Sequence, residues 1–485
     1  MVRVTDVMGS GEITASWRVL LGPRYLGTST LLAGAVALYA TNEFLTVSLL
    51  PSAIADIGGE RLYAWVTTLY LVGGVVAAAT VNATLQRVGA RWSFLLGLGV
   101  FGIGSVVCAV PPSMEVLLIG RTLQGAAGGL LAGLGYALIN ATLPRSLWTK
   151  ASALVSAMWG VATVAGPTAG GLFAQFGLWR WAFGAMAMLS AAMAVLVPLV
   201  LPAGRVDAGD NALASRIPLW SLLLLGSAAM TVSVAQVPTN VAATAALLAL
   251  SLILVAGFVL VDRRMAVKVL PLSAFGAGPL KWIYLTLCVL MAAAMVDMYV
   301  PLFGQRLAHL VPLTAGFLGA ALAVGWAMGE ILSASLSHKQ VINRVVMVAP
   351  LVLALGLILT ALTQIDNAPV GFVVTWALGL TIAGIGIGAA WPHLSAWAMQ
   401  CVDDEKEGAA AAAAINLIEV IAGAFGAGLA GVVVNSAPGD MVVAARWLFA
   451  VFAALGALAT VSALAVVASY RASKGQRRPV NPPAE

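Results

Sequence analysis

The chain has 485 residues, of which 61% are hydrophobic and only 9% are charged, and its mean hydropathy is +0.99. Soluble globular proteins are about one quarter charged, so this composition excludes a soluble protein and indicates a polytopic membrane protein. The net charge of +6 would suit an acidic partner such as nucleic acid, but the positions of the cations give a different explanation.

Apolar stretches of about 20 residues are long enough to cross a bilayer as helices. The sequence contains fourteen of them, so we expect an all-α protein with both termini on the same side. The expected segments are residues 29–53, 62–82, 92–111, 115–140, 150–175, 180–201, 217–236, 241–261, 282–304, 312–334, 343–363, 370–399, 408–434 and 443–469.

The cations indicate the orientation of these helices. Of the 25 Lys and Arg residues, twenty fall on the side that holds the termini, four fall on the opposite side, and Arg121 lies inside a helix. The positive-inside rule places both termini in the cytoplasm. The excess of basic residues therefore reflects the topology of the chain in a cell membrane, and no nucleic-acid partner is expected.

Two longer segments, 201–218 and 261–282, interrupt the closely spaced helices, and only two helices lie between them. The simplest architecture is two six-helix bundles with a two-helix insert, which suits a transporter whose halves rock around a central site. The expected divisions are a cytoplasmic tail (1–28), an N-terminal bundle (29–201), a linker with two inserted helices (202–280), a C-terminal bundle (281–470) and a second cytoplasmic tail (471–485).

Few ionisable residues lie inside the expected helices. They are four acids and one base: Glu43, Arg121, Asp297, Glu330 and Glu419. A charged side chain in hydrocarbon is costly, so such residues normally face a cavity or a partner. Four acids in apolar helices are what a cavity that handles protons or other cations would need.

The first helix carries Asn42 and Glu43, with Thr46 one turn on, and so presents a short polar stripe. Glu43 lies about ten residues from the outer end of its helix and Arg121 about seven from that of its own, so at 1.5 Å per residue the two can approach each other. A structural ion pair with Arg121 and a functional role for Glu43 are both compatible with this position.

The positions of the other three acids suggest further interpretations. Asp297 shares a helix face with Pro301, which predicts a bend, but it could also be a satisfied polar residue near the outer surface. Glu330 lies nearer the cytoplasmic end, where a long side chain reaches water. Glu419 is central in its helix. In the fifth helix, GVATVAGPTAGG (160–171) is rich in glycine and predicts a segment that bends and slides.

Several motifs resemble those of the major facilitator superfamily. GPTAGG resembles its antiporter motif, IGRTLQGAAGG its helix 4 motif, and QRVGAR (86–91) the loop between its helices 2 and 3. With LLPSAIADIGG after the first helix, WRWAF at 179–183 and GIGIGAAWPHLSAWAM before helix 13, the order resembles the fourteen-spanner drug:proton antiporter family from about residue 38 to about residue 435.

This resemblance implies the major facilitator fold and the export of amphiphilic, often cationic compounds in exchange for protons, with Glu43 and Arg121 central to coupling. It also implies gating roles for the matching residues of the two other motifs, which are Arg87, Gly89, Arg91, Gly166, Pro167, Gly170 and Gly171. The expected partners are protons, small amphiphilic substrates and the lipid bilayer, with no cofactor, no metal and no evident obligate protein partner.

Three positions depart from the family's pattern, and one of them is Asn82, which stands where the loop motif usually has a glycine. Gln86 stands where the loop motif usually has an aspartate, which weakens the charge contacts that latch the cytoplasmic side. The family's helix 1 acid lies nine residues before the proline corresponding to Pro51, and that position is Asn42 here. Glu43 is therefore displaced by one residue, about 100° around the helix.

Other functions remain open at this point. A dedicated exporter of one endogenous metabolite or lipid would share the same fold, and so would a non-transporting sensor. A lipid-modifying enzyme would need a nucleophile with a base, or a metal cluster, whereas His309, His338 and His393 are scattered over different segments. No GxxxxGK[ST] phosphate loop occurs, which agrees with transport that does not use ATP.

Overall fold

The computed structural model describes residues 17–78, 80–144, 147–201, 218–238, 240–265, 270, 272–276, 278–336, 338–401 and 405–476. Within these ranges every regular element is a helix, which confirms the all-α expectation. The polar linker expected at 202–217 and the last part of the C-terminal tail, 477–485, lie outside the described residues.

The helices form two bundles with a helical pair between them in sequence. The N-terminal half contains α1 (Trp17–Leu20), α2 (Leu26–Ile57), η1 (Glu60–Leu62), α3 (Tyr63–Ala78), α4 (Val81–Ala109), α5 (Met114–Ala137), α6 (Ile139–Thr142), α7 (Trp148–Gln175) and α8 (Trp179–Val200). The pair consists of α9 (Leu219–Val234) and α10 (Val241–Asp262). The C-terminal half contains η3 (Leu272–Phe275), α11 (Leu280–Ala294), η4 (Met295–Tyr299), α12 (Val300–Leu307), α13 (Pro312–Ala334), α14 (Lys339–Leu362), α15 (Val370–Gln400), α16 (Glu405–Ser436) and α17 (Met441–Gln476).

In the described part of the chain, twelve helical segments are long and apolar enough to cross a membrane. The two other expected segments correspond to α7, which has 28 residues, and to α9, which has 16. All fourteen expected segments are thus helical, while the number of actual crossings stays a prediction. Helix α1 and the first turn of α2 lie within the segment expected as an N-terminal tail.

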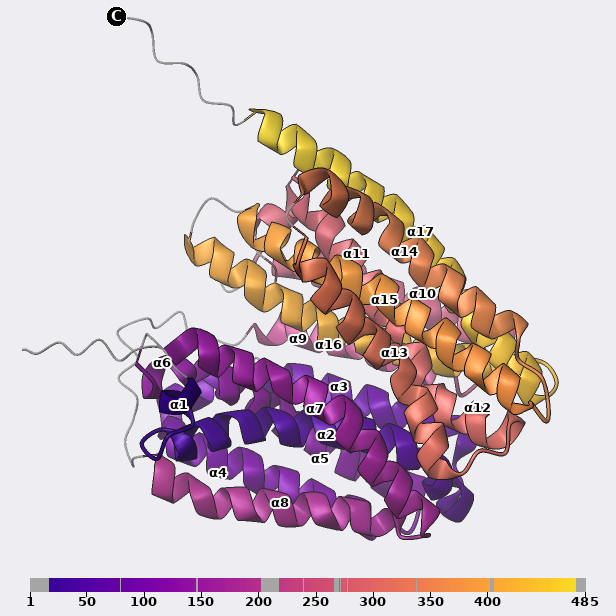
Figure 1. Ribbon diagram of the computed structural model, residues 1–485, viewed down its shortest axis with the longest axis horizontal. Helices are drawn as coiled ribbons and strands as arrows, with labels where there is room; N and C mark the ends of the chain where they lie inside the picture. The colour runs from indigo at the N-terminus through magenta and orange to yellow at the C-terminus, as the bar shows by residue number, and fades with distance from the viewer. Residues whose placement is uncertain are drawn as a thin grey trace, which may run out of the picture.

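The two halves meet at one end and diverge at the other (Figure 1). We call the end where they meet, marked by Glu60, Tyr63 and Leu313, the packed end. We call the opposite end, which carries α1 and α6, the divergent end. Helix α9 packs against α3 of one half and α16 of the other, and α10 packs against α9, so the inserted pair lies along one seam between the halves.

Glycines let helices within a half approach closely. A side chain at Gly125 of α5 would collide with the Tyr70 carbonyl group of α3, and one at Gly129 would collide with the Gly74 carbonyl group. Gly133 continues the same face and lies against Val81. The small residues that follow Arg121 on one face of α5 therefore form a close helix contact.

Two helices depart from their expected shapes. The region expected as a loop around residues 86–91 is helical on both sides of Gly89, whose φ of 81° lies in a region that glycine tolerates and other residues adopt with strain. The segment expected as one helix, 282–304, divides into α11, η4 and α12. Because Pro301 has no N–H and its ring crowds the carbonyl group of Asp297, the N–H of Val300 bonds to that carbonyl in the tighter 3-10 pattern. The helix predicted to bend at Pro301 is thus interrupted by a 3-10 turn just before this proline.

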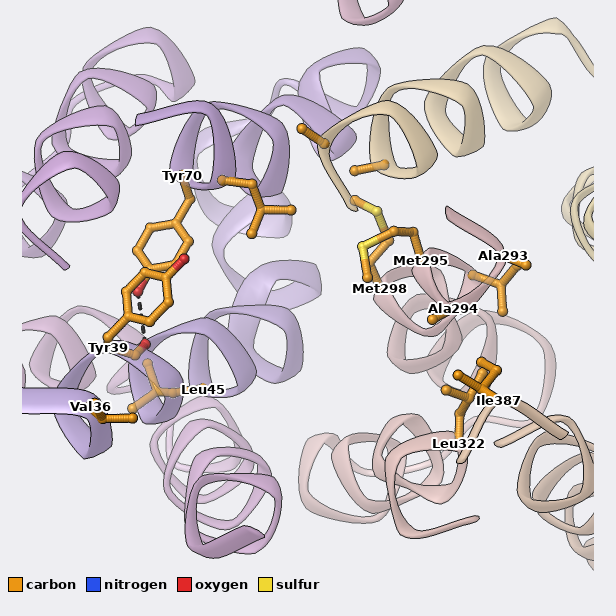
Figure 2. Close-up of a cluster of buried hydrophobic side chains, with 14 of the residues drawn as sticks. Val36, Tyr39, Leu45, Tyr70, Ala293, Ala294, Met295, Met298, Leu322 and Ile387 are labelled. Atoms are coloured by element: carbon orange, nitrogen blue, oxygen red, sulfur yellow. Dashed lines mark hydrogen bonds between the residues drawn. The ribbon is translucent and has the colours of Figure 1, made fainter. Parts of the chain in front are cut away.

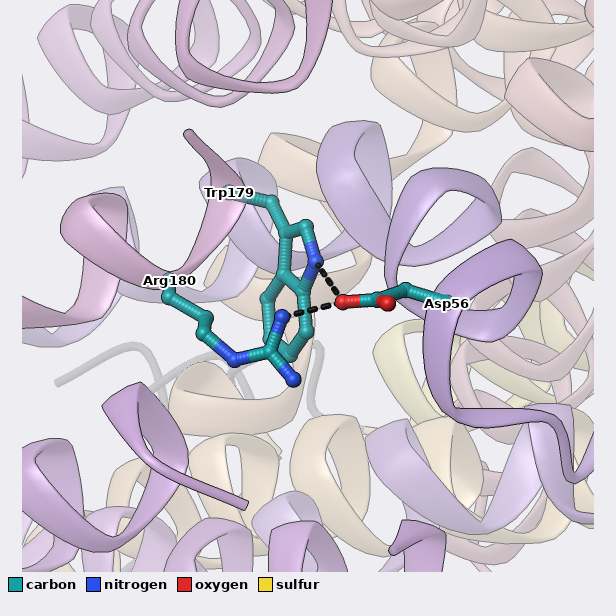
Figure 3. A network of polar contacts seen from close by, with 3 residues as sticks. All are labelled: Asp56, Trp179 and Arg180. Atoms are coloured by element: carbon teal, nitrogen blue, oxygen red, sulfur yellow. Dashed lines mark hydrogen bonds and ion pairs between the residues drawn. The ribbon is translucent and has the colours of Figure 1, made fainter. Parts of the chain in front are cut away.

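A polar cluster fastens α8 to the end of α2 at the packed end (Figure 3). The Asp56 carboxylate accepts a hydrogen bond from Trp179 Nε1 at 3.1 Å and forms an ion pair with Arg180. The Arg180 guanidinium also lies over the Trp179 ring, 4.4 Å from its centroid. This cluster belongs to the N-terminal half alone, so it helps that half to move as a unit.

Candidate functional site

Arg121 is held inside the N-terminal half by neutral groups. Its side chain is only 1% exposed, and its guanidinium donates to Gln124 Oε1 at 2.9 Å and to the Val66 carbonyl oxygen at 3.4 Å. The guanidinium carbon lies 3.9 Å from the centroid of the Tyr70 ring, a close cation–π contact. These contacts stabilise a buried positive charge without a carboxylate partner.

Gln124 is the centre of this network. Its Nε2 donates to Ser105 Oγ of α4 at 2.9 Å and to Asn42 Oδ1 of α2 at 3.5 Å, while its Oε1 accepts from Arg121. One buried amide therefore joins α2, α4 and α5. Sequence reasoning missed Gln124 and Ser105 because neither is charged. The available signal was the three-residue spacing between Arg121 and Gln124, which places both on one helix face.

Neighbouring residues of α2 face in different directions. Asn42 is fully buried and reaches the Gln124 amide, and its own Nδ2 has no hydrogen-bond partner. Glu43, about 100° further around the helix, is half-buried and makes none of the ion pairs found among the described residues. The structure therefore places Asn42, rather than Glu43, in the network that holds Arg121, although the charges of Glu43 and Arg121 still interact.

The four predicted acids come from four elements and belong to one electrostatic group. Asp297 lies on η4, Glu330 on α13 and Glu419 on α16, and each is half-buried like Glu43. Charge interactions connect Glu43 with Asp297 and with Glu419, and Glu419 with Glu330. Carboxylates in such a group repel one another when all are ionised, so protons or a bound cation would stabilise the group.

Aromatic rings lie in both halves. In the N-terminal half, Tyr39 and Tyr70 stack with ring centroids 5.1 Å apart, and the Tyr70 hydroxyl donates to the Tyr39 carbonyl oxygen at 2.8 Å (Figure 2). Trp159 meets the edge of Tyr39 at 5.9 Å. In the C-terminal half, Trp326 and Trp391 lie 5.0 Å apart. In the ranges that the structure describes, no group of three His, Cys, Asp or Glu side chains could hold a metal ion.

The predicted gating residues of the QRVGAR motif surround the kink in α4. Arg87 is exposed, Arg91 is half-buried, and neither belongs to an ion pair between described residues. Arg91 Nε is buried without a hydrogen-bond partner. Gly89 supplies the turn itself. Near the kink in α4, the described residues therefore form no ion pair that could latch the cytoplasmic side in this arrangement.

The predicted gating residues of α7 are all buried: Gly166, Pro167, Gly170 and Gly171. A side chain at Gly170 would collide with the Leu45 carbonyl oxygen of α2, and one at Gly171 would lie 2.6 Å from the Leu313 Cα of α13. Helix α7 therefore contacts its own half through one glycine and the opposite half through the next.

Three polar contacts join the halves at the packed end. They are the Glu60–Arg306 ion pair at 2.8 Å, the hydrogen bond from Tyr63 Oη to the Met298 carbonyl oxygen at 2.9 Å, and the hydrogen bond from Asn435 Nδ2 to the Arg61 carbonyl oxygen at 3.1 Å. Sequence reasoning did not single out any of these residues. They hold the two halves together at the packed end.

Comparisons with known proteins agree with this architecture. The model of the Major Facilitator Superfamily matches residues 32–427. A protein of Mycobacterium tuberculosis named as a probable multidrug-efflux transporter is 64% identical over 468 residues, which cover 96% of this chain and 98% of that protein.

Two solved structures share the fold at low sequence identity. A D-xylose–proton symporter aligns with a TM-score of 0.62 and 15% identity, covering 90% of this chain and 96% of that one. An auto-inhibited peptide transporter of the POT family aligns with a TM-score of 0.62 and 14% identity, covering 94% and 99%. With two helical bundles, apolar spans and a family match over most of its length, the chain belongs to the Major Facilitator Superfamily.

Proposed function

We propose that the protein exports amphiphilic, cationic compounds across the cell membrane in exchange for protons. The observation that carries this proposal is the group of four half-buried acids contributed by both halves, Glu43, Asp297, Glu330 and Glu419. Intramembrane acids that face a shared interior are suited to binding a proton or a cation. The name of the 64% identical relative, a probable multidrug-efflux transporter, supports export of several compounds rather than one.

The exchange of substrate for protons follows because both compete for the same carboxylates. An ionised carboxylate in a low-dielectric interior attracts an organic cation, and protonation of the same carboxylate removes that attraction. Substrate binding and proton binding therefore exclude each other. If the packed end faces outside, as the positive-inside pattern predicts, the divergent end takes up substrate from the cytoplasm. Protons that arrive from outside then displace the substrate when the packed end opens.

Arg121 acts in this scheme as a fixed positive charge. It is held by Gln124, Val66 and Tyr70 rather than by an acid, so its position does not depend on whether Glu43 is protonated. The charges of Arg121 and Glu43 nevertheless interact.

The movement of the bundles depends on the two glycine-containing motifs. We assign Arg87, Gly89 and Arg91 to a hinge and latch at the divergent end. We assign Gly166, Pro167, Gly170 and Gly171 to a sliding contact, because small residues let α7 move against α2 and α13 without displacing side chains. Alternating access then consists of rocking one bundle against the other around the acids.

The testing experiment is ethidium transport in proteoliposomes under an imposed pH gradient. Wild-type flux is expected to follow the gradient, and Glu43→Gln is expected to abolish that dependence. Glu115→Gln is the matched control, because Glu115 is an exposed acid in the first turn of α5, and it should transport like the wild type. Ethidium flux that ignores the gradient in the wild type would contradict proton coupling, and no flux at all would favour a narrower substrate.

The double variant Asn42→Asp/Glu43→Gln locates the acid. Asn42 belongs to the Arg121 network, whereas Glu43 interacts electrostatically with Asp297 and Glu419. If coupling requires an acid in contact with that network, the double variant should regain gradient-driven flux. If coupling requires an acid facing Asp297, it should remain inactive, which is the result we expect.

A further inference from the structure

The short 3-10 helix η4 carries three consecutive residues that face the opposite half. Asp297 interacts electrostatically with Glu43 of α2. The carbonyl oxygen of Met298 accepts a hydrogen bond from Tyr63 Oη of α3 at 2.9 Å. The ring of Tyr299 stacks on that of Tyr63, with centroids 4.6 Å apart and an interplanar angle of 21°. One helical turn thus contacts both the central acids and the packed end.

The conformation of η4 is a local departure from a continuous helix. It exists because Pro301 cannot donate to the carbonyl group of Asp297. A 3-10 turn within a membrane-spanning segment often marks a hinge. The Tyr299 hydroxyl is buried here without a hydrogen-bond partner, and a buried polar group without a partner costs free energy. This turn is therefore held by contacts with its surroundings as well as by its own backbone hydrogen bonds.

Tyr63 is the residue that holds it. Its side chain is only 1% exposed, and both its hydroxyl and its ring engage η4 from across the interface between the halves. The other polar contacts at this end are weaker restraints, because the Glu60–Arg306 ion pair has side chains that are 66% and 51% exposed and exposed pairs contribute little.

We propose that Tyr63 is a positioning residue for the transport cycle: by holding η4 against α3, it ties the charge of Asp297 to the opening of the packed end. When both carboxylates are ionised, Asp297 and Glu43 repel each other across the interface, so neutralising Asp297 favours the packed arrangement. This inference rests on the proposed function in one respect only, namely that the transport cycle changes the charge of Asp297.

Accessibility of the packed end tests this directly. Ser48 of α2 is 1% exposed and lies against Gly316 of α13, so a Ser48→Cys reporter is shielded while the halves are packed. The full-length protein is reconstituted in nanodiscs with Cys108, Cys288 and Cys401 replaced by serine, and the rate of modification by a charged thiol reagent is measured.

In this background, Tyr63→Phe removes the hydrogen bond and keeps the ring. We expect labelling about two- to tenfold faster, the shift that loss of one buried hydrogen bond gives to a two-state equilibrium. Tyr470→Phe is the matched control. The Tyr470 hydroxyl donates to Gln400 at 3.1 Å and its ring stacks on Trp397, all within the C-terminal half. It should leave the labelling rate within about twofold of the parent, a change of less than about 0.4 kcal/mol.

The variant Asp297→Asn distinguishes a specific positioning role of Tyr63 from a general loosening of the packed end. In the parent it is expected to slow labelling severalfold, and in the Tyr63→Phe background this effect should disappear. Equal labelling of Tyr63→Phe and the parent would overturn the proposal. So would an Asp297→Asn effect of the same size in both backgrounds, because additivity means that Tyr63 and Asp297 act independently. The assay uses neither substrate nor a proton gradient, so its outcome is distinguishable from failure of ethidium transport.

Discussion

Replacing Gln124 with leucine tests the buried network most directly. Leucine has a similar volume but no amide, so Arg121 Nη1 loses its acceptor and Ser105 Oγ loses its donor. A hydrogen bond to a charged group contributes about 1.5–3 kcal/mol and a neutral one about 0.5–1.5 kcal/mol, so the expected destabilisation is about 2–4 kcal/mol. At the usual unfolding entropy per residue, a chain of this length loses about 1 °C per kcal/mol, so its melting temperature should fall by about 2–4 °C.

The assay is thermal unfolding of the purified protein in detergent, with Gln124→Glu as the matched variant. Glutamate keeps an acceptor for Arg121 but offers no donor to Ser105 or Asn42. It should therefore retain more stability than leucine. A melting temperature for Gln124→Leu within about 1 °C of the wild type would refute the assignment of Gln124 as the centre of the network.

Three further outcomes are expected. Gly89→Ala forces a Cβ into a backbone conformation (φ 81°, ψ 169°) that costs a residue other than glycine about 1–3 kcal/mol, so its melting temperature should fall, and an unchanged value would contradict the kink. Gly170→Leu drives a side chain into the Leu45 carbonyl group of α2 and should reduce ethidium flux at least about tenfold, since overpacking costs about 1–3 kcal/mol. Normal flux would show that α7 need not stay close to α2. Asp56→Asn disturbs an ion pair with two half-exposed partners, so its flux should stay within about twofold of the wild type. A larger loss would mean that the α2–α8 contact takes part in transport.

The helices could be predicted because a membrane imposes one requirement on the backbone. Apolar runs of sufficient length must satisfy their hydrogen bonds internally, so each run predicts a helix. The ends of the helices follow less directly. The kink in α4 depends on the backbone angles of Gly89. Pro301 predicted an irregularity near η4, but the contacts of η4 with α3, which is far away in sequence, could not be predicted.

The charged members of the site could be predicted because burying a charge is costly and therefore conspicuous in a sequence. The direction of each side chain could not. Glu43 and Arg121 match in depth, yet Arg121 is satisfied by Gln124 and Tyr70 instead. Burying a neutral amide such as that of Gln124 carries no charge penalty. The sequence therefore does not distinguish this residue from any other polar residue in a helix. Its importance arises only when three helices bring partners to it.

The short length of α9 has a consequence for the surrounding lipids. At 1.5 Å per residue its 16 residues extend about 24 Å, whereas the hydrocarbon core of a typical bilayer is about 30 Å thick. Because α9 lies against both α3 and α16, a bilayer that thins to match it is deformed beside the seam between the two bundles. Hydrophobic mismatch of this kind costs fractions of a kcal/mol per Å. If the two bundles rock as proposed, the rate of that movement is expected to depend on the length of the lipid acyl chains.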